Sequence, residues 1–250
     1  MKPSLSDPTV YGSRAKLGVI VPPTNTANEA EWNRMAPDGV SVHSARMPLH
    51  TDTTSAHGKQ ALYDDVGKFS RDLAQAGVSV VAYGCTAGSM VTPMEQLPGF
   101  MRKETGIPAV TTAQSLVLGL RALGARKVAV ATPYHDALND HEIHFLADQG
   151  IETVAMRGLG IGANGPAEYR LIARIPLDQV YAHARGAFVP AADALLISCT
   201  DFATLPLIER LERDIGKPVV TSNQATFWAA LRAAGVQDRF TSFGALLQQH

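Results

Sequence analysis

The sequence has little net charge, few cysteines and no long apolar run, and each shortage excludes a class of protein. Its 250 residues carry 22 Lys and Arg against 23 Asp and Glu, a formal net charge of −1 at pH 7. This balance lacks the positive excess typical of proteins that bind nucleic acid or anionic membranes. Every apolar stretch is interrupted before the roughly 20 residues that a membrane-spanning helix needs. We therefore expect no nucleic-acid partner and no membrane partner.

The scarcity of cysteine and the polar start of the chain bear on its compartment. Only two cysteines are present, too few for a disulfide framework. Residues 1–15 form a polar tail without the apolar segment of a secretory signal. Both features predict free thiols in a reducing cytoplasm. Because 46% of the residues are apolar and only 18% are charged, the chain can bury a sizeable core.

What the sequence does contain is a repeated order of buried strands and amphipathic helices. Short β-branched runs predict strands at residues 17–21, 78–82, 109–111, 128–131, 194–197 and 219–221. Apolar residues at helical spacing predict helices at residues 64–76, 116–123, 136–149, 206–215 and 225–234. This order predicts an α/β fold with mostly parallel sheets flanked by helices, in which ligands bind at the carboxyl ends of the strands.

Three pairs of segments recur in the same order at an offset of 110 to 114 residues. KLGVIVP at 16–22 matches KVAVATP at 127–133, GCT at 84–86 matches SCT at 198–200, and PAVTTAQ at 108–114 matches PVVTSNQ at 218–224. Three pairs in register predict two pseudo-symmetric lobes with a cleft between them. We expect residues 16–113 to form the first lobe, with residues 223–250 packing back on it, and residues 114–222 to form the second.

The two cysteines occupy matching places in this repeat. Cys85 and Cys199 each follow a buried-looking strand, precede a threonine and begin a loop that leads into a helix. Equivalent strand ends of two lobes would face each other across the cleft, where backbone N–H groups would stabilise a thiolate and an anionic ligand. One alternative is a pair of buried core thiols, since free cysteine is among the most often buried residues. A structural disulfide is the other alternative.

An ordered set of segments carries a family resemblance. These are residues 19–25 (VIVPPTN), 84–86 (GCT), 131–134 (ATPY), 158–161 (GLGI) with Asn164, 198–200 (SCT) and 218–224 (PVVTSNQ). Together they resemble the aspartate/glutamate racemase superfamily, and within it the branch of maleate cis-trans isomerases and arylmalonate decarboxylases. The resemblance covers residues 16 to about 235. It implies two pseudo-symmetric α/β lobes with an active site between them, and chemistry without metal, flavin or nicotinamide cofactor.

The resemblance also implies a division between branches. Arylmalonate decarboxylases carry glycine at the position that matches Cys85, whereas racemases and maleate isomerases keep both cysteines. In an isomerase, the family chemistry implies that the Cys85 thiolate adds to an alkene carbon of a cis-diacid. Cys199 then protonates the neighbouring carbon, which gives a succinyl-like adduct. Rotation about the new single bond and elimination yield the trans-diacid.

Five further matched residues are candidates for substrate binding, and each has a structural alternative. They are Asn25, Thr86, Tyr134, Asn164 and Thr200. The alternatives are an Asx turn or helix cap for Asn25 and the two threonines, loop packing for the tyrosine, and a glycine-rich turn for Asn164. The segment 43–55 is similar to a variable lid of the family, with a solvated loop as its alternative.

Several other residues and motifs do not join this site. Neither Arg46 nor Arg157 can be placed in the cleft, and we expect Asn139 at the surface. Residues 160–165 (GIGANG) satisfy G-x-G-x-x-G, but Pro166 follows and no acidic residue ends a following strand, which argues against a dinucleotide site. In HEIH at 141–144 the histidines are one residue too close for a zinc helix, so we expect a solvated helix face. GCTAG at 84–88 only loosely matches a nucleophile elbow.

The sequence therefore predicts a cytoplasmic, cofactor-independent isomerase that converts a small unsaturated dicarboxylate such as maleate into fumarate. A two-thiol racemase of amino acids or hydantoins, an arylmalonate-decarboxylase-like protein and a relative of the ectoine-utilisation proteins are the alternatives within the resemblance. A non-catalytic binder of diacids with unreactive thiols is an alternative of another class. We expect a homodimer or higher homo-oligomer by family analogy and general frequency.

Overall fold

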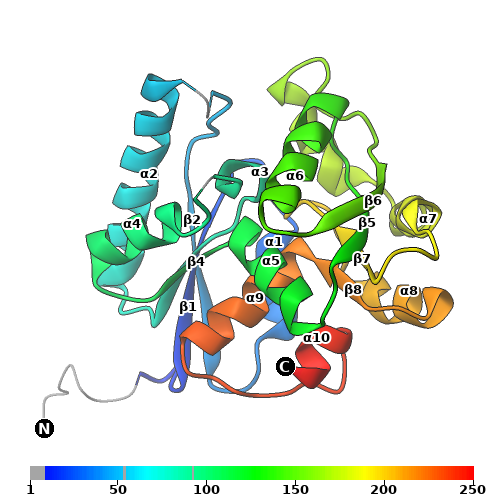
Figure 1. The fold of residues 1–250 in the computed structure, drawn as a ribbon. Coiled ribbons are helices and arrows are strands. Elements are labelled where there is room, and N and C mark those ends of the chain that lie inside the picture. The colour runs from blue at the N-terminus through cyan, green and yellow to red at the C-terminus, as the bar shows by residue number, and fades with distance from the viewer. Residues whose placement is uncertain (1–8, 53–54, 92) are drawn as a thin grey trace, which may run out of the picture.

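Two parallel sheets of the same topology form the frame of the molecule. In a computed structural model, which describes residues 9–52, 55–91 and 93–250, the strand orders are β2-β1-β3-β4 and β6-β5-β7-β8 (Figure 1). The first sheet comprises β1 (Ala15–Val21), β2 (Val40–Arg46), β3 (Val80–Tyr83) and β4 (Ala109–Thr111). The second comprises β5 (Lys127–Ala131), β6 (Glu152–Arg157), β7 (Ala194–Ile197) and β8 (Val219–Thr221). All neighbouring strands pair in parallel, which confirms the predicted two-lobe α/β class.

Prediction succeeded best for strands that are buried along their whole length, including the edge strands β4 and β8. β4, β7 and β8 have the predicted bounds, β1 and β5 begin earlier than expected, and β3 is shifted to Val80–Tyr83. The prediction omitted β2, and β6 gave only a weak signal. Both are edge strands whose residues are mostly half-buried and mixed in polarity, so they lack the continuous apolar run of a strand covered on both faces.

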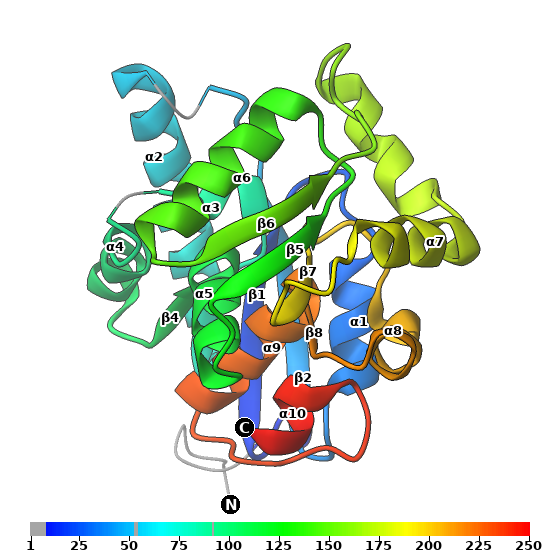
Figure 2. The same cartoon turned by 45° about the vertical axis from the view of Figure 1, so that its right-hand side comes forward.

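Helices cover both faces of each sheet. They are α1 (Asn28–Met35), α2 (Ala56–Gln75), α3 (Thr86–Ser89), α4 (Gln96–Thr105), α5 (Thr112–Ala122), α6 (Asp136–Asp148), α7 (Leu177–Ala187), α8 (Ile208–Ile215), α9 (Ser222–Ala233) and α10 (Ala245–Gln249), with 3-10 helices η1 (Pro166–Arg174) and η2 (Leu205–Leu207). α2 and α4 contact the first sheet on its outer side, and α1 and α9 contact it on the side that faces the second sheet (Figures 1 and 2). α7 and α8 contact the second sheet, opposite α5 and α6. The five predicted helices are α2, α5, α6, α8 and α9, most of them starting or ending a few residues away.

The helices α5 and α9 pack against each other where the lobes meet. Each begins with the same T-x-x-Q phrase, in which the threonine side chain accepts the backbone N–H of the glutamine three residues on: Thr111 from Gln114, and Thr221 from Gln224. The Thr226 hydroxyl of α9 also donates to the Thr112 hydroxyl of α5, at 3.1 Å. The repeated segments 108–114 and 218–224 are therefore the strand-to-helix turns that supply the two central helices.

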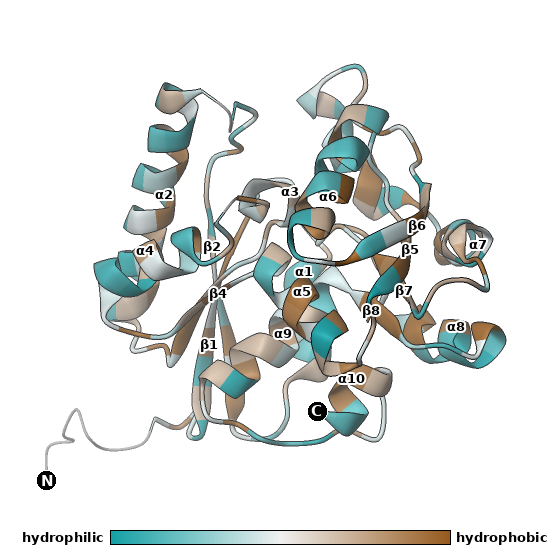
Figure 3. Cartoon of the chain, in the orientation of Figure 1, coloured by the Kyte–Doolittle hydropathy of each residue, from teal (hydrophilic) through white to brown (hydrophobic). Residues whose placement is uncertain are grey.

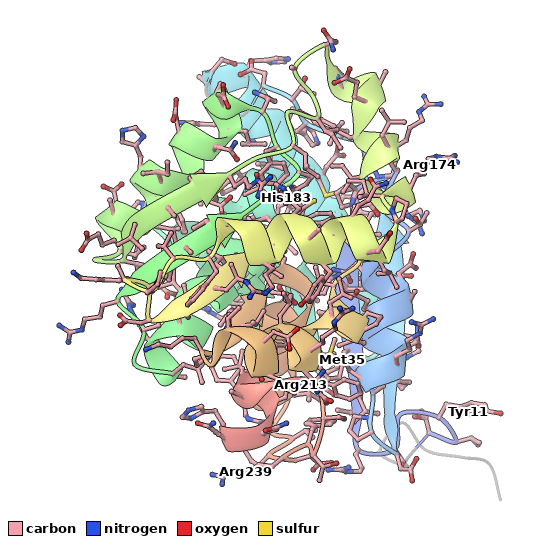
Figure 4. The ribbon with its side chains drawn as sticks, turned by 90° about the vertical axis from the view of Figure 1, so that its right-hand side faces the viewer. Tyr11, Met35, Arg174, His183, Arg213 and Arg239 are labelled. Atoms are coloured by element: carbon pink, nitrogen blue, oxygen red, sulfur yellow. The ribbon has the colours of Figure 1, made fainter. Side chains whose placement is uncertain are left out.

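Alternation along the strands and amphipathic helices build the core. Leu17, Val19 and Val21 of β1 belong to a buried cluster that also contains Ile197 of the second sheet, so this core is continuous across the two lobes. Figure 3 shows the same division on α2 and α8, whose hydrophilic residues lie on the outer side. Figure 4 looks onto α7, which carries the buried His183. Its Nε2 donates toward the carbonyl oxygens of Thr132 and Arg157, at the ends of β5 and β6.

A buried polar network also joins the lobes. The carboxylate of Glu31 accepts the side-chain N–H of Asn223 at 2.7 Å and the backbone N–H groups that open η2. Asn223 Oδ1 accepts the amide of Asn28, and its backbone oxygen accepts the Trp32 indole N–H at 3.1 Å. Trp32 in turn packs edge-on against Phe227, with ring centroids 5.5 Å apart. One asparagine of α9 thus satisfies three side chains of α1.

The expected domain limits stay a prediction, with some contacts now defined. α9 contacts β3 and β4 of the first sheet, whereas α10 contacts α9 and β8 (Figure 2). Residues 1–8 of the expected polar tail lie outside the described residues. Within the described ranges, no helix combines the length and the apolar character required to cross a bilayer.

Replacing Asn223 with alanine should test the interlobe network. The variant leaves the buried Glu31 carboxylate without its side-chain donor, so we expect the free energy of unfolding to fall by about 2–4 kcal/mol. Urea denaturation measures this loss. Asn33→Ala on the exposed side of α1 is the matched control, with an expected change within about 0.5 kcal/mol. Equal effects of the two changes would contradict a special role for Asn223.

Candidate active site between the lobes

A cavity of about 450 Å³ lies at the carboxyl ends of strands from both sheets. Asn25 follows β1, Cys85 and Thr86 follow β3, Tyr134 follows β5, and Cys199 and Thr200 follow β7; all six line the cavity. These are six of the seven residues that the sequence singled out. The structure therefore brings both cysteines, 114 positions apart, into the wall of one pocket. Both are free thiols, Cys85 partly exposed and Cys199 buried.

Cys85 lies at the start of the short helix α3. Its Sγ accepts the backbone N–H of Gly88 at 3.4 Å, and the Tyr83 hydroxyl forms a second hydrogen bond with it. A Cβ at position 88 would lie 2.4 Å from that hydroxyl oxygen, so the close approach requires glycine. Both hydrogen bonds lower the pKa of Cys85, but burial outweighs them and raises it above its ordinary value of 9.0.

Cys199 has an unusual backbone conformation. Its φ is +133°, in the region that favours glycine, and such a conformation costs on the order of 1–3 kcal/mol. The Ser222 hydroxyl accepts the Cys199 N–H at 2.9 Å and fixes this turn. Burial raises the pKa of Cys199 to about 12, although the Tyr134 hydroxyl and the Asp201 N–H, which lower it, both bind the sulfur. Cys199 therefore carries its proton throughout the neutral range.

These directions correct one expectation from the sequence. Backbone N–H groups do stabilise the thiolates, as predicted, but burial exceeds their effect and both thiol pKa values are raised. In the ligand-free protein the two sulfurs are thus neutral at pH 7. The large rise keeps Cys199 in the protonated form that an acid needs before it donates, and the partly exposed Cys85 is the better placed nucleophile.

Asn25, Thr86 and Thr200 make hydrogen bonds that join the two lobes. Asn25 Oδ1 accepts the N–H groups of Ala27 and Asn28, the Asx-type arrangement that we gave as its alternative. Its amide donates to the Thr200 hydroxyl, and that hydroxyl donates to the Gly84 carbonyl oxygen, both at 3.0 Å. The Thr86 hydroxyl lies 2.9 Å from that of Ser222. These side chains therefore hold the cavity wall together, and their substrate contacts stay predictions.

Tyr134 is buried and held by its neighbours. Its N–H donates to the Thr132 hydroxyl at 3.0 Å, and its carbonyl oxygen accepts the Asn139 amide at 3.2 Å. Asn139 also accepts the Thr132 hydroxyl, at 2.6 Å. The expectation that Asn139 lies at the surface is wrong, because this side chain is buried and closes the loop that orients the tyrosine.

Asn164 is the one predicted site residue that does not line the cavity. It is exposed, and its amide donates to Glu168 at 2.7 Å, while the same carboxylate accepts the Gly162 N–H. Gly160, Gly162 and Gly165 have positive φ values, so the sequence of this turn is accounted for by backbone conformation. These contacts are those of the turn alternative for Asn164, and its contact with substrate stays a prediction.

The solvated face expected for HEIH at 141–144 is confirmed for His141 and His144, which are exposed, and is wrong for Glu142. His141 also lines the cavity, with Nε2 3.1 Å from the Met90 carbonyl oxygen. Glu142 is only 1% exposed and lies beside Ser198, where neither side chain makes a hydrogen bond of normal geometry within the described residues. Burial raises the pKa of Glu142 to about 7, while the nearby Ser198 hydroxyl lowers it. Its negative charge in turn raises the pKa of Tyr134.

The sequence missed several lining residues. Asp201 lines the cavity and could have been predicted from the sequence, because it follows Cys199 and Thr200 at the same strand end. Tyr169 also lines it but could not, because it lies in η1 and follows no strand directly. In the expected lid, His50 and Thr51 line the cavity, and residues 53–54 lie outside the described residues. Arg46 pairs with Glu29 and donates to the Asn25 carbonyl oxygen, outside the lining. No lysine or arginine is among the described lining residues.

Comparison with known proteins identifies similar chains. The profile of the family "Arylmalonate decarboxylase" matches residues 17–247. Arylmalonate decarboxylase from Bordetella bronchiseptica is 33% identical over 228 residues, which cover 89% of this chain and 92% of the relative. Maleate isomerase from Nocardia farcinica is 31% identical over 247 residues, covering 94% and 96%.

A solved structure gives a similarity in geometry as well. It is a cysteine-to-serine variant of Nocardia farcinica maleate cis-trans isomerase with a covalently bound succinylcysteine intermediate. It is 28% identical to this chain, with a TM-score of 0.82 and coverage of 94% of this chain and 99% of that one. A crystal structure of arylmalonate decarboxylase, at 32% identity, gives a TM-score of 0.80, with coverage of 94% and 100%.

The Glu142→Gln variant should remove a pH dependence of stability. The folded protein holds the Glu142 proton up to about pH 7, whereas an ordinary glutamate loses it near pH 4.5, so ionisation destabilises the fold as pH rises between these values. Relative to wild type, the variant should gain about 2 kcal/mol in unfolding free energy from pH 5.5 to 8. Urea unfolding at both pH values measures this. Glu152→Gln, at the exposed end of β6, should show no such gain, and a gain there would refute the assignment.

Thiol alkylation should follow the raised pKa values. In the Cys199→Ser variant, we expect the rate of Cys85 modification by iodoacetamide to rise about tenfold per pH unit from pH 7 to 8.5, because only the thiolate reacts. The Cys85→Ser variant, which reports on the buried Cys199, should react more slowly throughout. Mass spectrometry of timed samples measures both rates. A rate that is already constant below pH 7 would contradict a raised pKa at Cys85.

Proposed function

The chain belongs to the arylmalonate decarboxylase family, and we propose that within it this enzyme is a cysteine-based cis-trans isomerase of a small unsaturated dicarboxylate, maleate. The observation that carries the proposal is the pair of free thiols that equivalent strand ends deliver to one cavity. A similar fold that holds a succinylcysteine intermediate supports the same use of a cysteine. No cofactor takes part in the proposed reaction.

The proposed cycle uses one thiol as nucleophile and the other as acid. The Cys85 thiol first loses its proton to solvent. Its thiolate then forms a bond from sulfur to one alkene carbon, and the electron pair of the double bond moves to the neighbouring carbon. That carbon takes the proton of the Cys199 thiol, and Cys199 becomes a thiolate. After rotation about the new single bond, Cys199 removes a proton from the same carbon, the double bond reforms and the carbon–sulfur bond breaks. Neither thiol is consumed, and the product is the trans-diacid.

Neutral donors hold the substrate carboxylates in this proposal. The Thr86 and Thr200 hydroxyls are engaged with Ser222 and the Gly84 carbonyl oxygen. Other polar groups along the wall include the Thr51 and Tyr169 hydroxyls and the backbone N–H groups of the loop at Thr86. Hydrogen bonds to charged acceptors are among the stronger ones in proteins, at roughly 1.5–3 kcal/mol each, so such a set can bind a small dianion.

Decarboxylation of a substituted malonate is the second candidate. The cavity has an apolar side that includes Ala137, Leu138 and Ile172, which a compact diacid such as maleate would leave largely uncovered. An aryl or alkyl substituent would fill it. In that reaction Cys199 would protonate the carbanion, and Cys85 would form no bond to the substrate. The two candidates therefore differ in whether Cys85 forms an adduct. Cytoplasmic location and homo-oligomeric assembly stay predictions.

The Cys199→Ser variant should trap the adduct on which the isomerase proposal depends. In this variant solvent can still protonate the carbanion slowly, but no thiolate removes that proton again, so the adduct should accumulate. We expect a mass increase on Cys85 equal to one maleic acid molecule, located by peptide mass spectrometry. The wild-type protein should convert maleate to fumarate, a reaction that proton NMR follows. The Cys85→Ser variant should be at least about 1000-fold less active and should form no adduct.

The opposite results are equally informative. Wild-type protein that leaves maleate unchanged but releases carbon dioxide from an arylmalonate, with activity retained in Cys85→Ser, would replace the isomerase by the decarboxylase. Turnover of neither substrate, with maleate still bound, would favour a non-catalytic diacid binder.

A further inference from the structure

Asp201 is a buried carboxyl group in the cavity wall that the proposed cycle does not use. It is 6% exposed, two residues beyond Cys199. Its Oδ1 accepts the backbone N–H of Thr26 at 2.8 Å and that of Ala27 at 3.3 Å. Its Oδ2 has no hydrogen-bond partner within the described residues. The side chain is thus held by one oxygen, and the other is buried without a described partner, where it can take up a proton.

The charges around Asp201 do not balance a bound dianion. Arg46 on β2 is the cation that acts on it, and that guanidinium is already paired with Glu29 and engaged by the Asn25 carbonyl oxygen. Cys199 is the titratable neighbour on its own strand end. The other titratable groups around the cavity are His50 of the lid, His135 and His141 at α6, Tyr134, Tyr169 and Cys85, with Glu142 behind Tyr134.

A dicarboxylate placed between the two thiols would bring two more negative charges near Asp201. Like charges at short range favour the neutral form of a carboxyl group. Burial already raises the pKa of Asp201 to about 6, and two further negative charges at short range raise it strongly, so the carboxyl group holds a proton at neutral and mildly basic pH while the dianion is bound. Since Oδ1 is fixed by two N–H groups, the proton belongs on Oδ2, where it turns an unpartnered acceptor into a donor.

We propose that Asp201 takes up one proton on Oδ2 when a dicarboxylate dianion binds in this cavity. The choice of ligand rests on the proposed function. The proton comes from solvent, and no covalent bond other than that O–H forms. Asp201 is then a specificity-determining residue: the cavity binds the dianion together with a proton, in place of a fixed cation.

The proposal has a defined pH signature. Above the pKa of the free Asp201, each binding event must take up a proton, so the dissociation constant should rise about tenfold per pH unit. Asparagine at this position mimics the protonated acid at every pH, because its oxygen can accept the same two N–H groups and its NH2 group can occupy the place of Oδ2. Asp201→Asn should therefore bind the dianion without pH dependence.

Isothermal titration calorimetry with maleate tests this on the Cys85→Ser protein, which binds without turnover. Titrations from pH 7 to 8.5, in two buffers of different ionisation enthalpy, give the dissociation constant and the number of protons taken up. The matched control is Asp193→Asn, because Asp193 also accepts two backbone N–H groups, from Arg126 and Lys127, at an exposed position outside the cavity. It should behave like its parent.

In the Cys85→Ser parent we expect uptake of close to one proton and a tenfold weaker affinity for maleate at pH 8 than at pH 7. In the double variant, which carries Cys85→Ser and Asp201→Asn, we expect neither effect. At pH 8 the Asn variant should bind about tenfold or more tightly than its parent. Maleate binding without proton uptake overturns the inference and leaves the proposed function intact. Uptake that persists in the Asn variant assigns the proton to a histidine or to Glu142, and also overturns it. Absence of maleate binding overturns the proposed function together with the inference.

Discussion

The hydroxyl group of Ser222 is the point at which the two halves of the cavity are tied together. It accepts the N–H of Cys199 from the second sheet and bonds the Thr86 hydroxyl from the first, at 2.9 Å in each case. Ser222 can do this because it is the first residue of α9, which begins at the end of β8 and packs against both α5 and the first sheet. The strained backbone of Cys199 is stable only because this helix start fixes it. Loss of the α5–α9 packing would thus separate the thiols as well as the lobes.

Desolvation is the common cause of the electrostatic properties of the cavity. The two thiols, Asp201 and Glu142 come from three segments, since Cys199 and Asp201 share the loop after β7, and burial is the largest influence on each and raises every one of their pKa values. Local N–H donors oppose this at Cys85, Cys199 and Asp201 without reversing it. The ligand-free site is therefore nearly uncharged at its two sulfurs, and ionisation there is a consequence of chemistry or binding rather than a resting property.

Strand ends explain both the success and the failure of the sequence in predicting this site. Buried apolar runs locate the parallel strands and therefore their carboxyl ends. Cys85, Cys199 and Tyr134 could thus be placed at the carboxyl ends of strands from their spacing and the internal repeat. Asn139 and Glu142 could not, because whether one face of a helix is buried depends on what the second lobe packs against it. Asn164 sits in a turn whose glycines satisfy backbone conformation alone, so the matching motif did not by itself determine a contact with the cavity. The edge strand β2 was not predicted, because its residues are mixed in polarity and form no continuous apolar run.

A cavity without fixed cations along its described lining suits a reaction in which one negative charge moves between two sulfurs. In the proposed cycle the charge starts on Cys85, passes to carbon and ends on Cys199, then returns. A cation beside either sulfur would stabilise one of these states and hold the charge there. Ionised Asp201 has the opposite effect on Cys199, since it raises the pKa of that thiol. If Asp201 becomes neutral on binding, this repulsion is removed while the substrate is present, and Cys199 becomes a better proton donor at the step that requires one. The buried carboxyl group would then couple occupancy of the cavity to the acidity of its second thiol.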